Sequence, residues 1–190
     1  MFQYFFENQL KKILGLKFNT VLFDNMDIKK YKDIDLDYEL LCYAEIFIDK
    51  ETSPGNLGQN AWADQRVAYI LSGSFEGPLI KGKVLPGGGD WPVFSHQRPN
   101  IMKSDVRAVW ETNDGAKIYV TYTGKIIKPN KYIIDNHKDV SDIKSQHYYF
   151  RMSPNFSTSS EKYFWLNDIV TIAIGRLISG GVVYKIFKIK

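Results

Sequence analysis

The chain has 190 residues and a formal charge of +4, which is small for its length. Its lysines and arginines are scattered, so the sequence lacks the clustered basic surface that nucleic-acid binding needs. Hydrophobic residues make up 44% and aromatic residues 15%, which excludes intrinsic disorder over most of the chain and suffices for the core of one ordinary domain.

The single cysteine, Cys42, cannot form an internal disulfide and favours a reducing compartment. No apolar run approaches the roughly 18 residues that would span a bilayer. The first seven residues lack the basic segment of a signal peptide. We therefore expect a cytoplasmic protein with no membrane partner and no nucleic-acid partner.

Taken in chain order, residues 2–14 place apolar side chains at helical spacing, and Gly15 is a plausible stop. We interpret this segment as a short amphipathic helix across one end of the domain; a helix that binds a partner or a membrane surface is the alternative. A charged connector follows. The predicted organisation is an N-terminal extension over 1–37 and a β-barrel domain over 38–190.

From residue 38 onward the pattern is typical of strands separated by turns. Eight strand-like runs are expected, at 38–49, 65–75, 78–86, 104–113, 116–127, 146–153, 161–174 and 182–190. The pair Asp114-Gly115 predicts a tight hairpin, whereas 51–60 and 128–145 read as long loops. Because no helix separates the strands, the predicted fold class is all-β, an antiparallel up-and-down β-barrel of about eight strands. A barrel of this size encloses either a side-chain core or one small ligand.

Residues 73–91 combine glycine-spaced strands with a glycine-rich turn at 87–89 that presents Asp90 beside Trp91. Three glycines permit backbone conformations that other residues avoid and clear space around the acid. In a partly dry site the carboxyl would have a raised pKa and would suit a general acid or base. The alternative is a turn aspartate that satisfies backbone N–H groups, with Trp91 closing the barrel end.

Arg107 and Tyr119 are the other two candidates for polar or catalytic contacts. Arg107 follows Asp105 by two residues, so their side chains share one strand face. Facing inward, Arg107 would anchor a carboxylate or an enolate oxygen; otherwise it forms a structural ion pair with Asp105. Tyr119 would donate a hydrogen bond to a ligand, or it is a core tyrosine.

Four further side chains are candidate ligand contacts. Glu76 is a second acid and Arg151 a second anchor, while Trp165 and Asn167 would share a strand face as an apolar wall and a neutral polar group. The three histidines show no metal-ligand spacing, and no phosphate-binding or dinucleotide-binding motif opens a helix. We expect neither a metal nor a cofactor.

Three blocks of uncommon residues at fixed spacing carry a family resemblance. They contain Phe75-Glu76-Gly77-Pro78 with Leu85-Pro86-Gly87-Gly88, then Thr112 with Asp114-Gly115-Ala116, then Tyr149-Phe150-Arg151 with Trp165-Leu166-Asn167. Together they resemble the domain-of-unknown-function family 3237, also called the UPF0311 family, from about residue 40 to the C-terminus. One departure is Asp64-Gln65-Arg66, where that pattern has a glycine before the arginine. The resemblance implies an antiparallel β-barrel and little about activity.

Three functional hypotheses follow. The preferred one is binding of a small, partly apolar or aromatic molecule in the barrel mouth, through Asp90, Arg107 and Tyr119, with Trp91 and Trp165 as walls. The second is a cofactor-free isomerase or lyase, in which Asp90 is the base and Arg107 or Tyr119 holds the oxyanion. The third is a structural barrel that acts through oligomeric surfaces. A homo-oligomer is expected, because barrels often associate through an exposed strand face.

Overall fold

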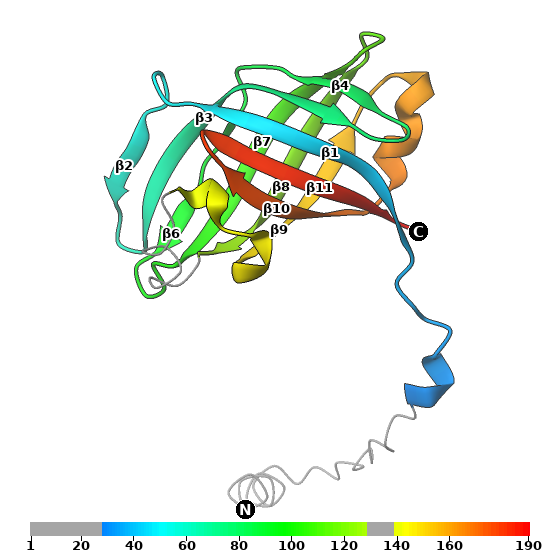
Figure 1. Ribbon diagram of the computed structural model, residues 1–190, viewed down its shortest axis with the longest axis horizontal. Coiled ribbons are helices and arrows are strands. Elements are labelled where there is room, and N and C mark those ends of the chain that lie inside the picture. Colours follow the sequence, from blue (N-terminus) through cyan, green and yellow to red (C-terminus); the bar gives the residue numbers. More distant parts are fainter. Residues whose placement is uncertain (1–27, 129–138) are drawn as a thin grey trace, which may run out of the picture. The chain divides into compact units, whose positions relative to one another are not determined.

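The computed structural model describes residues 28–128 and 139–190 (Figure 1). The helix predicted over 2–14 lies outside these described residues. The short 3₁₀ helix η1 (Ile28–Tyr31) belongs to an N-terminal unit, and residues 36–190 form a second compact unit. The elements of the second unit are β1 (Tyr38–Asp49), β2 (Gly55–Gln59), β3 (Ala63–Glu76), β4 (Lys81–Val84), β5 (Gly89–Asp90), β6 (Val93–Ser95), β7 (Ile101–Thr112), β8 (Lys117–Ile127), η2 (Val140–Asp142), η3 (Ser145–His147), β9 (Tyr149–Ser157), η4 (Glu161–Asp168), β10 (Thr171–Ile178) and β11 (Gly181–Ile189).

The strands of the second unit close on themselves as an antiparallel barrel. β1 pairs with β11 on one side and with β3 on the other, so the wall has no free edge at the join between the first and last strands. Between them the order runs β11, β10, β9, β8, β7, and then the short strands β4, β5 and β6 share one wall position between β7 and β3. This eight-position wall confirms the predicted fold class.

One end of the barrel is filled by aromatic side chains. Trp110 of β7 is almost fully buried and stacks on Phe75 of β3, with ring centroids 4.5 Å apart. Phe156 of β9 meets the same indole edge-on at 5.7 Å. Strand alternation explains this packing, because every second residue of β7, β8 and β9 is buried and the residues between are largely exposed.

The helix η4 covers this filled end, and here one sequence prediction was wrong. Residues 161–174 were expected to be a strand, but only the part from Thr171 onward is one. In η4, Tyr163 and Leu166 are buried three residues apart, which matches the 3₁₀ repeat. The side chain of Asn167 supports the turn by accepting the backbone N–H of Thr158 at 2.9 Å and donating to the carbonyl of Phe164 at 2.9 Å.

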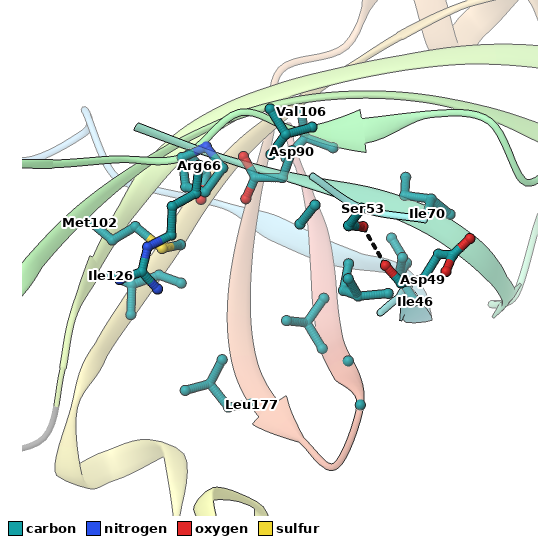
Figure 2. A pocket seen from close by; sticks show the side chains of 18 of the residues that line it. Ile46, Asp49, Ser53, Arg66, Ile70, Asp90, Met102, Val106, Ile126 and Leu177 are labelled. Carbon is teal, nitrogen blue, oxygen red and sulfur yellow. Dashed lines mark hydrogen bonds between the residues drawn. The ribbon is translucent and has the colours of Figure 1, made fainter. Parts of the chain in front are cut away.

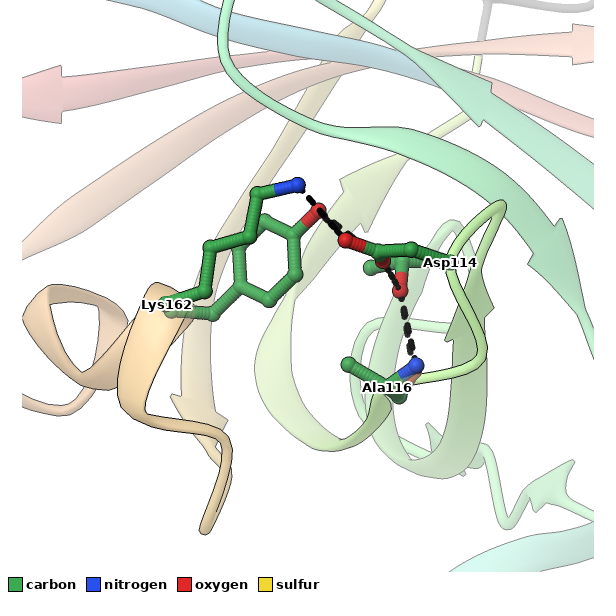
Figure 3. Close-up of polar contacts among 5 residues, drawn as sticks. Asp114, Ala116 and Lys162 are labelled. Atoms are coloured by element: carbon green, nitrogen blue, oxygen red, sulfur yellow. Dashed lines mark hydrogen bonds and ion pairs between the residues drawn. The ribbon is translucent and has the colours of Figure 1, made fainter.

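The predicted Asp114-Gly115 hairpin between β7 and β8 is confirmed, and it anchors η4 (Figure 3). Gly115 has φ +86°, a conformation that glycine adopts without strain. The Asp114 carboxylate accepts hydrogen bonds from Lys162 Nζ at 2.6 Å and from the Tyr163 hydroxyl at 3.1 Å. Lys162 first, and then the Thr112 hydroxyl, hold the pKa of the Asp114 carboxyl well below its usual range.

Candidate functional site

The other end of the barrel is hollow. A cavity of about 510 Å³ opens there (Figure 2), a volume within the usual range for small-molecule sites. Most of its wall is apolar and comes from inward-facing residues of β1, β3, β7, β8 and the β10–β11 hairpin. These include Ile46, Ile70, Val106, Ile126, Leu177 and Val182. Buried members of the hydrophobic core, among them Ile46, Phe150 and Tyr184, are part of this wall, so the cavity adjoins the core directly.

The glycine-rich turn delivers Asp90 into this cavity. Gly87 has φ +96°, and a Cβ on Gly88 would collide with the carbonyl oxygen of Arg107, so larger residues would disturb both positions. β5 is then inserted between two long strands, and Asp90 pairs with Ala68 of β3 and Val106 of β7. This pairing sets the Asp90 side chain on the inner face, where it lines the cavity.

The Asp90 carboxyl has a pKa well above that of an exposed aspartate. Its burial raises the pKa to about 6, and the nearby charge of Asp105 adds to the increase. Hydrogen bonds oppose it: the Asp105 backbone N–H donates to Asp90 Oδ1 at 3.0 Å, and the Ser104 hydroxyl also favours the charged form. Burial outweighs these contacts, so both protonation states of Asp90 are accessible near pH 6.

Three hydroxyl groups accompany Asp90 in the cavity wall. Ser104 is buried, and its Oγ has no hydrogen-bond partner of normal geometry within the described residues. Tyr122 and Tyr184 meet edge-on with ring centroids 5.5 Å apart. Burial raises the pKa of both phenols, and the Asp90 charge raises them further, so both stay protonated. The cavity thus offers the titratable Asp90 carboxyl and neutral hydroxyl groups in a largely apolar space, and the charged residues Asp49, Lys50 and Arg66 also line it.

Three residues predicted to surround Asp90 point away from the cavity. Trp91 follows Asp90 directly in extended chain, so its side chain leaves on the opposite face and is 39% exposed. Arg107 does share a face with Asp105, as predicted, and the two form an ion pair at 3.1 Å, but that face is the outer one. Tyr119 is 45% exposed, because its strand places the even-numbered residues inward. These three residues are therefore not part of the cavity.

The remaining four predicted contacts are also outside it. Glu76 is exposed at the end of β3 and pairs with Lys81 at 2.8 Å. The Arg151 guanidinium donates to the carbonyl of Phe150 at 2.9 Å. Trp165 and Asn167 lie in η4 at the filled end; the former packs against the core and the latter supports the helix. The expectation that they share a strand face fails because the segment is not a strand.

Sequence reasoning missed Ser104, Tyr122, Tyr184 and Arg66, which line the cavity. The sequence pattern could have identified Tyr122. It shares a strand face with the apolar residues Ile118 and Val120, and an apolar face predicts the inner side of a barrel. Both of these neighbours are fully buried in the structure. Across residues 28–128 and 139–190, no three His, Cys, Asp or Glu side chains gather where they would hold a metal ion. In the same ranges, no helix is both long and apolar enough to cross a membrane.

A closed antiparallel barrel, filled at one end and hollow at the other, defines the class of small β-barrel proteins with an interior cavity. Within this class, the chain belongs to the family described as protein of unknown function (DUF3237), which matches residues 38–189. A UPF0311 protein from Clostridium acetobutylicum is 32% identical over 166 residues, which cover 86% of this chain and 99% of the relative. A UPF0311 protein from Rhodopseudomonas palustris is 34% identical over 116 residues, covering 60% of this chain and 71% of the relative.

A solved structure gives the same result for the fold. The crystal structure of a β-barrel-like protein from Acinetobacter baumannii aligns with a TM-score of 0.68 at 28% identity, over 82% of this chain and 97% of that one. The resemblance inferred from the three sequence blocks is thereby confirmed.

Proposed function

We propose that this chain binds a small, partly apolar molecule in the open end of its barrel, with Asp90 as the main polar contact. The observation that carries the proposal is the cavity of about 510 Å³, whose wall is mostly apolar and includes the Asp90 carboxyl. Apolar lining with a few convergent polar groups is the usual composition of a ligand site. The Ser104 hydroxyl lies beside Asp90 and makes no well-formed hydrogen bond within the described residues, so it is a second polar group that a ligand can contact.

Fluorescence titration with N-phenyl-1-naphthylamine, a neutral apolar probe, tests this proposal. The wild-type protein should bind one probe molecule saturably. Leu177→Trp should abolish binding, because Leu177 faces the cavity and the larger side chain would occupy it. Ile172→Trp is the matched control, since this residue lies on the outer face of the same strand and is 41% exposed. Equal binding by both variants would place the probe elsewhere and defeat the proposal.

A second candidate function is acid–base catalysis by Asp90. The observation that favours it is the raised pKa of about 6 at a carboxyl that lines the cavity, because general bases work best when their pKa lies near the working pH. Perturbed carboxyls in clefts are often catalytic, although structural ones also occur. In this reading Asp90 accepts a proton from the bound molecule, and the hydroxyl of Ser104 or Tyr122 donates to the oxygen where charge develops.

The competence of this carboxylate as a base can be measured with 5-nitrobenzisoxazole, whose ring opens when a base removes its C3 proton. The wild-type rate should rise with pH through about 6, following ionisation of Asp90. Asp90→Asn should remove this phase, while Asp105→Asn should retain it. If Asp90→Asn reacts at the wild-type rate, Asp90 is not a base, and only the binding proposal remains.

A further inference from the structure

Two cations converge on one aromatic ring in the cavity wall. The Arg66 guanidinium lies 4.6 Å from the centroid of the Phe94 ring, and the Lys128 ammonium lies 4.8 Å from the same centroid. Arg66 and Phe94 both line the cavity, and Figure 2 shows Arg66 among its wall residues. Arg66 belongs to β3 and Phe94 to β6, and Lys128 directly follows β8, so the three residues are distant in sequence.

Neither cation has an anionic partner within the described residues. The side chains of Arg66 and Lys128 make no ion pair and no hydrogen bond there; both cations lie over the Phe94 ring, and the charge of Arg66 acts on Lys128. The neighbouring acids are already engaged. Asp64 pairs with His96 at 3.1 Å, and Asp49 accepts the backbone N–H groups of its own turn, including that of Thr52 at 3.0 Å.

The proximity of the two cations is itself unfavourable. Partial burial lowers the pKa of the Lys128 ammonium, and the positive charge of Arg66 lowers it further. Both residues are exposed to solvent, which weakens the repulsion, but like charges this close still repel each other. A bound anion would offset this repulsion and accept charge-assisted hydrogen bonds from both side chains.

The cavity therefore has two chemically different regions joined by an apolar wall. Asp90 and Ser104 form an interior region that takes hydrogen-bond donors. Arg66 forms a cationic region beside Phe94, and Lys128, which does not itself line the cavity, lies against the same ring. We propose that the ligand is an organic anion, with its carboxylate or other acidic group held by Arg66 and Lys128, its apolar body in the cavity and a hydroxyl group at Asp90. This inference rests on the proposed binding function and adds the class of ligand.

A pair of dyes that differ by one charge tests the inference. 1-Anilinonaphthalene-8-sulfonate and N-phenyl-1-naphthylamine share the same apolar body, and only the first carries an anionic group. We expect the wild-type protein to bind the anionic dye more tightly. In Arg66→Gln/Lys128→Gln its dissociation constant should increase about tenfold or more, the loss expected for a charged hydrogen bond, while the neutral dye changes less than about twofold. High salt should weaken the binding of the anionic dye and leave the binding of the neutral dye unchanged.

Lys103→Gln is the matched control for the loss of charge. Lys103 lies on β7 between two cavity residues, Met102 and Ser104, but its side chain is exposed on the outer face. It should change the binding of neither dye. Circular dichroism and urea unfolding would verify that each variant is folded.

The two proposals fail in different ways. If the double variant binds the anionic dye as tightly as wild type while the neutral dye still requires an open cavity, the anion inference is overturned and the binding function stands. If the wild-type protein binds neither dye, the proposed function and this inference are overturned together. The same holds if Leu177→Trp binds both dyes as tightly as the wild-type protein does.

Discussion

Replacing Asp90 with asparagine should make the protein more stable at pH 8 and change its stability little in acid. The reason is that the folded protein raises the pKa of Asp90 from 3.8 to about 6, chiefly through burial. Between these values the unfolded chain ionises this group more readily than the folded protein does. The contribution of the neutral Asp90 carboxyl to the unfolding free energy is therefore fully present below pH 3.8, and it is lost as the pH rises through about 6.

The expected size follows from the shift in the pKa. A shift of about two units corresponds to roughly 3 kcal/mol of unfolding free energy, since each unit is worth about 1.4 kcal/mol. Asparagine has nearly the same shape and cannot ionise. Its side-chain oxygen can still accept the backbone N–H of Asp105, which Asp90 accepts at 3.0 Å. Asp90→Asn should thus gain up to about 3 kcal/mol at pH 8, or roughly 6–12 °C in melting temperature for a chain of this length.

Urea unfolding of both proteins at intervals from pH 4.5 to pH 8 would measure this difference. Asp105→Asn is the matched control. This substitution removes the same charge from a residue beside Asp90, but the Asp105 carboxylate is half exposed. The unfolding free energy should therefore change by less than about 1 kcal/mol at every pH. A stability difference between wild type and Asp90→Asn that does not grow with pH, or a variant less stable at pH 8, would show that burial of this carboxyl is not costly.

Three further predictions concern the wall and the core. Gly82→Ala should lower the unfolding free energy by about 1–3 kcal/mol, because a Cβ there collides with a backbone carbonyl of the next strand; equal unfolding curves for it and the exposed control Ser74→Ala would refute this close contact. Trp110→Ala should cost about 3–5 kcal/mol, since that side chain is 1% exposed, whereas Trp62→Ala, 84% exposed, should cost less than about 0.5 kcal/mol; similar losses in urea would contradict the assigned core. Cys42, fully buried with its pKa raised to about 12 by burial, should not react with Ellman's reagent at pH 8 until urea unfolds the chain; complete modification of the folded protein within minutes would contradict its burial.

Much of the barrel is determined locally and was predictable. Alternating apolar residues with turn signals between them predict strands, and β1 begins and ends at the predicted residues, 38–49. The Asp114-Gly115 turn needs a positive φ at its glycine, which is a local requirement. The same holds for residues 87–89, whose three glycines mark a place where the backbone turns tightly and approaches another strand. Asp90, which lines the cavity, was singled out from this stretch alone.

The composition of the site was decided by tertiary structure. A strand period of two separates Asp90 from Trp91, but only the pairing of β5 with β3 and β7 determines which of them faces inward. Strand pairing also determines which face of β7 and β8 points inward. As a result Ser104 and Tyr122 line the cavity, whereas Arg107 and Tyr119 do not.

Long-range closure decided the rest. Arg66, Phe94 and Lys128 meet only because β3 and β6 pair with each other and β7 joins β6 to β8, contacts that no local pattern encodes. The sequence by itself therefore determined the strands, the turns and the acid at the tip of the glycine-rich segment. The tertiary structure alone decided which side chains share the cavity, since the inside of a barrel exists only after its first and last strands have paired.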